Sequence, residues 1–254
     1  MLIVLSPAKS LNFDTQNLIN EFTIPVFRAE TETLVKYLQK MSAKGLSDLM
    51  SISPTLAKLN YERYQTWDPS PEKSKQAILA FDGDVYDGLS ASSLKGEILR
   101  EAQNRIRILS GLYGVLKPLD LIQPHRLEMG TKLKTGRKND LYIFWKDKIV
   151  REINLAIKES ESPVLVNLAS NEYFKSIDQK KLKGKIVTPE FRDLKNGKYM
   201  MISFFAKKAR GMMTRFILEN GITDPEEMKA FDLEGYNFAP KMSSNEKFVF
   251  TRDN

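Results

Sequence analysis

The chain has 254 residues, 42% of them hydrophobic, with a formal net charge of +7, a single histidine and no cysteine. The lack of cysteine excludes disulfide bonds, thiolate metal sites and thiol-based peroxide chemistry, and the excess of cations favours a polyanionic partner such as nucleic acid. The apolar content is enough for a sizeable core, no run is long enough for a membrane span, and no basic leader precedes the first apolar run. We therefore expect one cytoplasmic domain over residues 1–254.

The first apolar run, from Leu2 to Leu5, is typical of a buried strand. Ser6 and Pro7 follow it, and these residue types often begin a helix at its N-cap and first position. A helix N-terminus at the end of a strand, with Lys9 beside it, predicts an anion site. A plain capped turn with a solvated lysine fits the same residues.

Residues 77–81 predict a second buried strand, and Asp82 and Asp84 follow it. Paired carboxylates near a strand end can bind Mg²⁺ or act as acid and base. Turns and helix caps are their commoner use, and the spacing matches no known metal loop. We expect no metal here.

A helical pattern from Glu97 to Leu109 leads into an apolar but irregular segment that extends to Gly130. Glycines and prolines interrupt this segment, and irregular backbone that is held rigidly is a common place for a site. The Gly-x-x-Gly turn at Gly111 and Gly114, between two apolar runs, also loosely resembles a helix-hairpin-helix, which presents N–H groups to phosphate. The segment carries four cations: Arg105, Arg107, Lys117 and Arg126.

Two further elements follow in the middle of the chain. Residues 141–160 have the apolar spacing of one long amphipathic helix, and residues 163–172 predict a third buried strand. Polar residues lie in this strand or just past its end: Asn167, Ser170, Asn171 and Glu172.

The clearest local pattern is a hairpin over residues 185–205, with its turn at Asn196 and Gly197. A helix follows it and ends at Gly221. No acidic residue lies between Lys195 and Leu218, which favours phosphate contact over a solvated basic face. Residues 236–250 predict a closing hairpin. The cations that share one face of the long helix are Lys207, Lys208, Arg210 and Arg215.

Four predicted strands thus end in polar or charged residues, and sites in α/β sheets form where such ends face one crevice. We expect a single α/β domain with a mixed sheet and one basic cleft. The groups at the four ends are Ser6 and Lys9, Asp82 and Asp84, Asn167 to Glu172, and Lys207 and Lys208.

Several blocks together closely resemble the YaaA family of bacterial peroxide-stress-resistance proteins. They are SPAK at 6–9, DGDVYDGL at 82–89, LSGLYGVLKPLDLIQP at 109–124, RLEMG at 126–130, NLASNEYFKSI at 167–177 and FFAKKARGMMTRFI at 204–217. One departure is His125, where the family is expected to have tyrosine, which argues against this histidine as a required ligand.

The resemblance implies a single α/β domain of unusual topology, with a helix-hairpin-helix-like element and a positively charged cleft that binds DNA. It also implies a cellular role in limiting unincorporated iron during hydrogen peroxide stress, which protects DNA and proteins from oxidation. Double-stranded DNA is then the expected partner of a monomer without a cofactor. The expected phosphate contacts come from Lys9, Arg105, Arg107, Lys117, Arg126, Lys207, Lys208, Arg210 and Arg215.

Two other functions compete with DNA binding. An enzyme acting on a nucleotide, nucleobase or nucleic acid in the same cleft would use acid and base groups, for which Lys9, Asp84, Asn167 and Glu172 are candidates. Direct iron storage fits least, because one histidine and no cysteine leave only carboxylates, and these do not cluster at ligand spacing.

Overall fold

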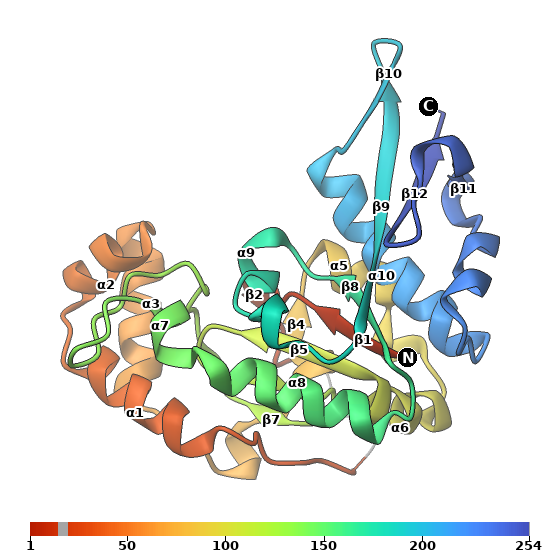
Figure 1. The fold of residues 1–254 in the computed structure, drawn as a ribbon. Coiled ribbons are helices and arrows are strands. Elements are labelled where there is room, and N and C mark those ends of the chain that lie inside the picture. Colours follow the sequence, from red (N-terminus) through yellow and green to blue (C-terminus); the bar gives the residue numbers. More distant parts are fainter. Residues whose placement is uncertain (15–19, 254) are drawn as a thin grey trace.

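A computed structural model describes residues 1–14 and 20–253. Its centre is a mixed eight-stranded sheet in the order β11-β12-β9-β8-β1-β5-β6, with β10 paired to the outer end of β9 (Figure 1). Two small two-stranded sheets, β2-β4 and β3-β7, lie outside it. The strands of the large sheet are β1 (Leu2–Leu5), β5 (Ile106–Ser110), β6 (Gly114–Leu116), β8 (Val164–Leu168), β9 (Lys185–Lys195), β10 (Lys198–Met200), β11 (Asn237–Phe238) and β12 (Lys247–Arg252).

Strand β1 lies at the middle of the sheet, between β5 and β8, and both pairings are parallel. All four residues of β1 are buried, because helices cover both faces of a parallel sheet. The connection from β1 to β5 and the connection from β5 to β8 run in opposite directions across the sheet. Crossovers of this kind are right-handed, so their helices are expected on opposite faces, and a crevice opens at the carboxyl end of the strand between them.

Helices surround the sheet, and α8 runs across one of its faces (Figure 1). In the part of the chain that the structure describes, no helix combines the length and the apolarity needed to cross a membrane. The α-helices are α1 (Arg28–Gln39), α2 (Ala43–Met50), α3 (Pro54–Gln65), α4 (Ala77–Ala80), α5 (Asp84–Leu89), α6 (Gly96–Arg105), α7 (Leu141–Trp145), α8 (Asp147–Glu159), α9 (Asn171–Phe174) and α10 (Ser203–Glu219). The small sheets use β2 (Ser10–Leu11), β3 (Lys75–Gln76), β4 (Phe81–Asp82) and β7 (Leu121–Ile122).

The segment after α6 differs from the expected helix. Helix α6 ends at Arg105, and the next five residues form β5, which is buried along its whole length beside β1. The second apolar run then turns back as β6, antiparallel to β5. A β-hairpin therefore occupies the place where two helices would be needed, and the helix-hairpin-helix is not confirmed.

Two other expectations need correction. Residues 77–81 form the short helix α4 and the first residue of β4 rather than a strand of the main sheet, because the N–H groups of Ala77 and Ile78 donate to the loop carbonyls of Asp120 and Pro118. The long helix expected over residues 141–160 is divided at Lys146, whose φ of 36° ends α7 before α8 begins.

The hairpins at the end of the chain are confirmed. Strands β9 and β10 pair antiparallel around Asn196 and Gly197, both of which have positive φ. Strands β11 and β12 form the closing hairpin, and β12 also pairs parallel to β9. The C-terminal strand is thereby part of the main sheet.

Candidate functional site

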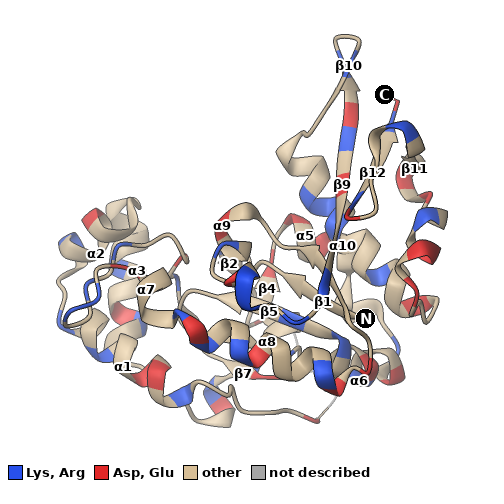
Figure 2. Ribbon diagram, viewed as in Figure 1, with Lys and Arg blue, Asp and Glu red and all other residues tan. Residues whose placement is uncertain are grey.

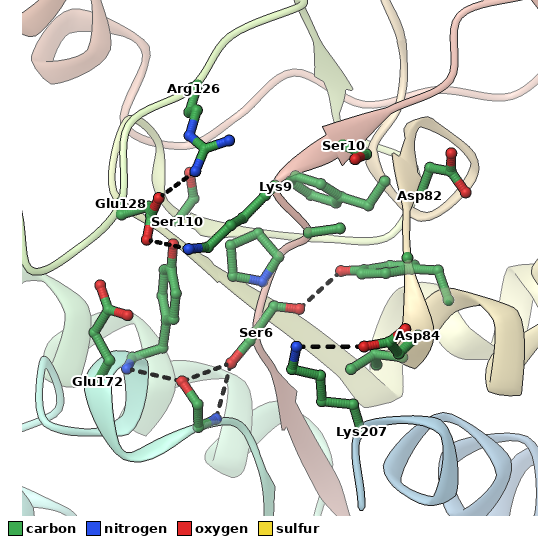
Figure 3. A pocket seen from close by; sticks show the side chains of 18 of the residues that line it. Ser6, Lys9, Ser10, Asp82, Asp84, Ser110, Arg126, Glu128, Glu172 and Lys207 are labelled. Atoms are coloured by element: carbon green, nitrogen blue, oxygen red, sulfur yellow. Dashed lines mark hydrogen bonds and ion pairs between the residues drawn. The ribbon is translucent and has the colours of Figure 1, made fainter. Parts of the chain in front are cut away.

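A cavity of about 440 Å³ opens at the carboxyl end of the parallel strands (Figure 3). Three serines from the ends of three adjacent strands line it: Ser6 after β1, Ser110 at the end of β5 and Ser170 after β8. Residues of the turn before α5, of the segment after His125 and of α10 complete its walls. This is the position at which open α/β sheets bind their ligands.

The hydroxyl of Ser6 joins two of these strand ends. Its Oγ accepts a hydrogen bond from the N–H of Ser170 at 2.8 Å and donates to Ser170 Oγ at 3.3 Å. The hydroxyl of Tyr86 donates to the Ser6 carbonyl at 3.0 Å. Residues 6–9 form no helix, so the prediction of an anion site at a helix N-terminus beginning at Ser6 is wrong. Ser6 instead links the ends of β1 and β8 at the base of the cavity.

Two ion pairs lie on opposite sides of Ser6 (Figure 3). Lys9 Nζ is 3.1 Å from a Glu128 carboxylate oxygen, and Lys207 Nζ is 3.3 Å from an Asp84 oxygen. In each pair the lysine is the outer partner, since the side chains of Lys9 and Glu128 are 66% and 26% exposed and those of Lys207 and Asp84 are 51% and 24% exposed. Lys9 and Lys207 therefore lie nearer the mouth of the cavity than the carboxylates with which they are paired.

Two arginines add to this arrangement. Arg126 binds Glu128 at 2.9 Å, so Glu128 is shared between Arg126 and Lys9. Burial lowers the pKa of Arg210, although nearby Glu190 acts in the opposite direction. The lining thus contains as many carboxylates as cations, and a cleft that is basic throughout is not confirmed. The carboxylates are Asp82, Asp84, Glu128 and Glu172, and the cations are Lys9, Arg126, Lys207 and Arg210.

The inner part of the cavity is aromatic. The Phe81 ring contacts the rings of Tyr86 and His125, with centroids 5.3 and 6.5 Å away. Burial lowers the pKa of His125 to about 4, although the hydrogen bond of its Nδ1 to the Gln123 carbonyl opposes the shift. Burial, followed by the charges of Glu172 and Glu128, raises the pKa of Tyr173. Both groups are therefore neutral near pH 7.

Glu172 has a structural contact as well as a place in the lining. Its carboxylate accepts a hydrogen bond from the N–H of Gly130 at 2.8 Å, and its carbonyl accepts one from the Tyr142 hydroxyl at 3.0 Å. The first residues of α9 therefore fix the loop that carries Arg126 and Glu128.

Six of the residues predicted as phosphate contacts or as acid and base groups line the cavity: Lys9, Asp84, Arg126, Glu172, Lys207 and Arg210. Asn167 is not among them. It is buried within β8, where its Oδ1 accepts a hydrogen bond from the N–H of Ala169 at 3.1 Å.

Three cations of the segment after α6 lie away from this cavity. Arg105 pairs with Glu101 at 2.6 Å and donates to the carbonyl of Ile222. Arg107 is 2% exposed and donates to the main-chain carbonyls of Gln103 and Ile106, and it lines a different cavity together with Lys117. Both arginines face protein groups rather than a common open surface.

The cations of α10 likewise fall into two groups, one that lines the cavity and one that lies away from it. Lys207 and Arg210 line the cavity, whereas Lys208 pairs with Glu234 at 2.5 Å. Arg215 pairs with Glu219 and donates to main-chain carbonyls after α5. The carboxylates that pair with Lys207 and Lys208, Asp84 and Glu234, come from other elements, which the acid-free stretch of sequence in α10 could not reveal.

Sequence reasoning missed Ser110, Glu128 and Tyr173. Ser110 was not recognised as the end of a strand because the residues before it were predicted to be helical. Glu128 lies within one of the blocks that carried the family resemblance, but nothing in its own spacing linked it to Lys9. Within residues 1–14 and 20–253, no group of three or more histidine or carboxylate side chains is placed to hold a metal ion.

This geometry defines an α/β protein with a polar crevice at the carboxyl end of a parallel sheet. Comparison with known sequences then shows the family. The sequence model of the family described as "Peroxide stress protein YaaA" matches residues 1–242, and the chain belongs to this family. It is 53% identical to a UPF0246 protein of Ralstonia pickettii (strain 12J) and 50% identical to one of Dechloromonas aromatica (strain RCB), each over 254 residues and 99% of both chains. A UPF0246 protein of Hahella chejuensis (strain KCTC 2396) is 49% identical over the full length of both chains.

Proposed function

We propose that the protein binds DNA as part of the response to peroxide stress, with the phosphate backbone at the mouth of the strand-end cavity. The observation that carries this proposal is the order of charges in the two ion pairs, where Lys9 and Lys207 lie outside Glu128 and Asp84. A phosphate that approaches the mouth meets the lysines first. The carboxylates beneath are left to accept hydrogen bonds from the base or sugar of one nucleotide.

The same order limits the strength of binding. Each lysine already has a carboxylate partner, so a phosphate must share it, and the gain per contact is smaller than for a free lysine. Such contacts fix the position of the backbone and carry little sequence information. We therefore propose binding that responds strongly to salt and weakly to sequence.

Limitation of unincorporated iron follows in this proposal from DNA binding rather than from storage. Protection of DNA at its backbone reduces the damage that iron and peroxide cause there.

The test is duplex DNA affinity measured by fluorescence anisotropy as a function of salt. Removal of both mouth lysines, in Lys9→Gln with Lys207→Gln, is expected to weaken binding and to reduce the salt slope by up to about 0.9 for each lost phosphate contact. The matched control is Lys73→Gln with Lys181→Gln, since these lysines are also exposed partners of carboxylates, at 2.8 and 2.6 Å. Equal slopes for the two double variants would refute the proposal.

A second function, catalysis on a nucleotide or nucleobase, is favoured by the four carboxylates of the lining, because a site that only held phosphate would gain nothing from them. Lys9, Asp84 and Glu172 remain the candidate acid and base groups. Asn167 does not line the cavity and is left out of this proposal.

The variant Asp84→Asn distinguishes DNA binding from catalysis. This change removes a negative charge under Lys207 and keeps the shape of the side chain, so it should leave DNA affinity equal or higher. If the protein is an enzyme, the same change should abolish turnover of a nucleoside, nucleotide and DNA panel analysed by mass spectrometry. No product from the unmodified protein on any member of the panel counts against catalysis and leaves DNA binding in place.

A further inference from the structure

The hairpin formed by β9 and β10 extends beyond the rest of the sheet (Figure 1). Lys185–Val187 pair with β8 and Thr188–Asp193 pair with β12, but the last residues of β9 pair with β10 alone. We call residues 195–204, from the end of β9 to the first turn of α10, the hairpin tip. Every residue of β10 within it is exposed.

Large apolar side chains gather on the hairpin tip. Tyr199 is 36% exposed, Met200 and Met201 are each 49% exposed, and Phe204 is 56% exposed. Met200 is the last residue of β10, and Met201 directly follows it. Neither is buried, and their exposure costs about 25 cal/mol for each Å² of apolar surface left in water. Exposed apolar side chains that are concentrated in one segment are a feature of interaction surfaces.

Charge indicates the partner. Lys195 and Lys198 are exposed on either side of the turn, and residues 194–206 contain no acidic residue (Figure 2). A carboxylate that reaches the tip is that of Asp253, which accepts a hydrogen bond from the Tyr199 hydroxyl at 2.6 Å. Cations that flank an exposed apolar patch are complementary to nucleic acid, in which phosphates flank the flat faces of the bases.

The hairpin tip is also connected to the cavity. It leads directly into α10, and Phe204 lies one turn of helix before Lys207, which lines the cavity mouth. A strand of DNA whose phosphate is held at Lys207 therefore passes close to the start of α10. Methionine and phenylalanine are among the side chains that proteins insert between base pairs as wedges.

We infer that the hairpin tip is a second DNA-binding element, in which Met201 and Phe204 insert against the bases and unstack the duplex next to the cavity. Lys195 and Lys198 hold the phosphates on either side. This inference rests on the proposed function, because it requires that the cavity mouth holds the same DNA.

The test uses a duplex that contains 2-aminopurine, a base whose fluorescence rises when it is unstacked. The unmodified protein is expected to raise the fluorescence several-fold on binding. Met201→Ser with Phe204→Ser should bind with an unchanged salt slope and should lose the rise. The matched control is Ile143→Ser with Leu155→Ser, which removes apolar side chains of similar exposure, 46% and 50%, at other places and should keep the rise.

The outcomes separate the inference from the proposed function. DNA binding without a fluorescence rise, or a rise that persists in the Met201 and Phe204 variant, overturns the inference alone. Failure of the unmodified protein to bind DNA overturns both. Binding of vesicles with anionic lipid that depends on Met201 and Phe204 overturns the inference, because the hairpin tip is then a membrane-binding surface.

Discussion

Gly211 of α10 lies directly against the main-chain carbonyl of Val85 in α5, so that a Cβ at position 211 would overlap the carbonyl oxygen. Gly88 of α5 meets the carbonyl of Lys208 in the same way. The two helices therefore cross with backbone against backbone. This crossing holds Lys207 next to Asp84 at the start of α5 and so builds one side of the cavity.

Gly211→Ala should destabilise the protein strongly, because the overlap is with main-chain atoms that cannot move aside individually. Overpacking of this kind costs about 1–3 kcal/mol or more in the free energy of unfolding, which denaturant titration would measure. Gly45→Ala in α2 is the control. A Cβ there meets other side chains at 3.5 Å, so alanine should be neutral or stabilising by up to about 1 kcal/mol. Equal stability of the two variants would contradict the close crossing.

His125 should make stability depend on pH. Its folded-state pKa of about 4 lies below the ordinary value of 6.5, so the unfolded chain takes up the proton first. The contribution is complete above pH 6.5 and is lost as the pH falls towards 4, by up to about 1.4 kcal/mol per pH unit. The difference in unfolding free energy between the protein and His125→Phe should change by this amount across that range. A constant difference would show that the ring is not buried in its neutral form.

Asp193→Ala should be among the most damaging changes far from the cavity. Asp193 is fully buried, binds Arg252 at 2.6 Å and accepts a hydrogen bond from the Tyr236 hydroxyl at 3.1 Å. Its removal takes the nearest carboxylate away from a largely buried guanidinium and leaves only the more distant carboxylate of Glu234, 3.7 Å away, which should cost up to about 3–5 kcal/mol. Asp68→Ala, which breaks an exposed pair with Lys73, should have little effect in the same urea titration.

Glu172→Ala should loosen a loop without unfolding the domain. The change removes the acceptor of the Gly130 N–H, so hydrogen exchange at Gly130 should accelerate while the global unfolding free energy falls by only about 1 kcal/mol. Glu172→Gln retains an acceptor oxygen and should preserve most of the protection. Unchanged exchange in Glu172→Ala would mean that the loop is held by other contacts.

The sequence predicted the structure correctly where the structure depends on a local pattern of residues. Leu2–Leu5 was identifiable as a strand because it is apolar on both faces, and the hairpin turn was identifiable from Asn196 and Gly197. The expected strand ends did converge in part, since Lys9, Asp84, Glu172 and Lys207 meet at one cavity.

Contacts between segments that are distant in the sequence could not be predicted from local patterns. Residues 106–110 have the apolar spacing of a helix end, but their pairing with β1 makes them a strand. Lys207 and Lys208 of α10 looked unbalanced because their carboxylates are supplied by Asp84 of α5 and by Glu234. Buried arginines such as Arg107 looked like phosphate contacts, because a sequence does not reveal which carbonyl oxygens will surround a guanidinium.

The central position of β1 has a consequence for synthesis on the ribosome. Ile3 pairs with Ile106 on one side and with Val166 on the other, so β1 leaves the exit tunnel well before either of its partner strands has been made. The entropy cost of closing loops this long is incurred before the strand contacts stabilise the chain, and this slows folding. The nascent chain therefore carries an unpaired apolar strand until β5 and β8 have been made, and holding chaperones are expected to bind it during that time.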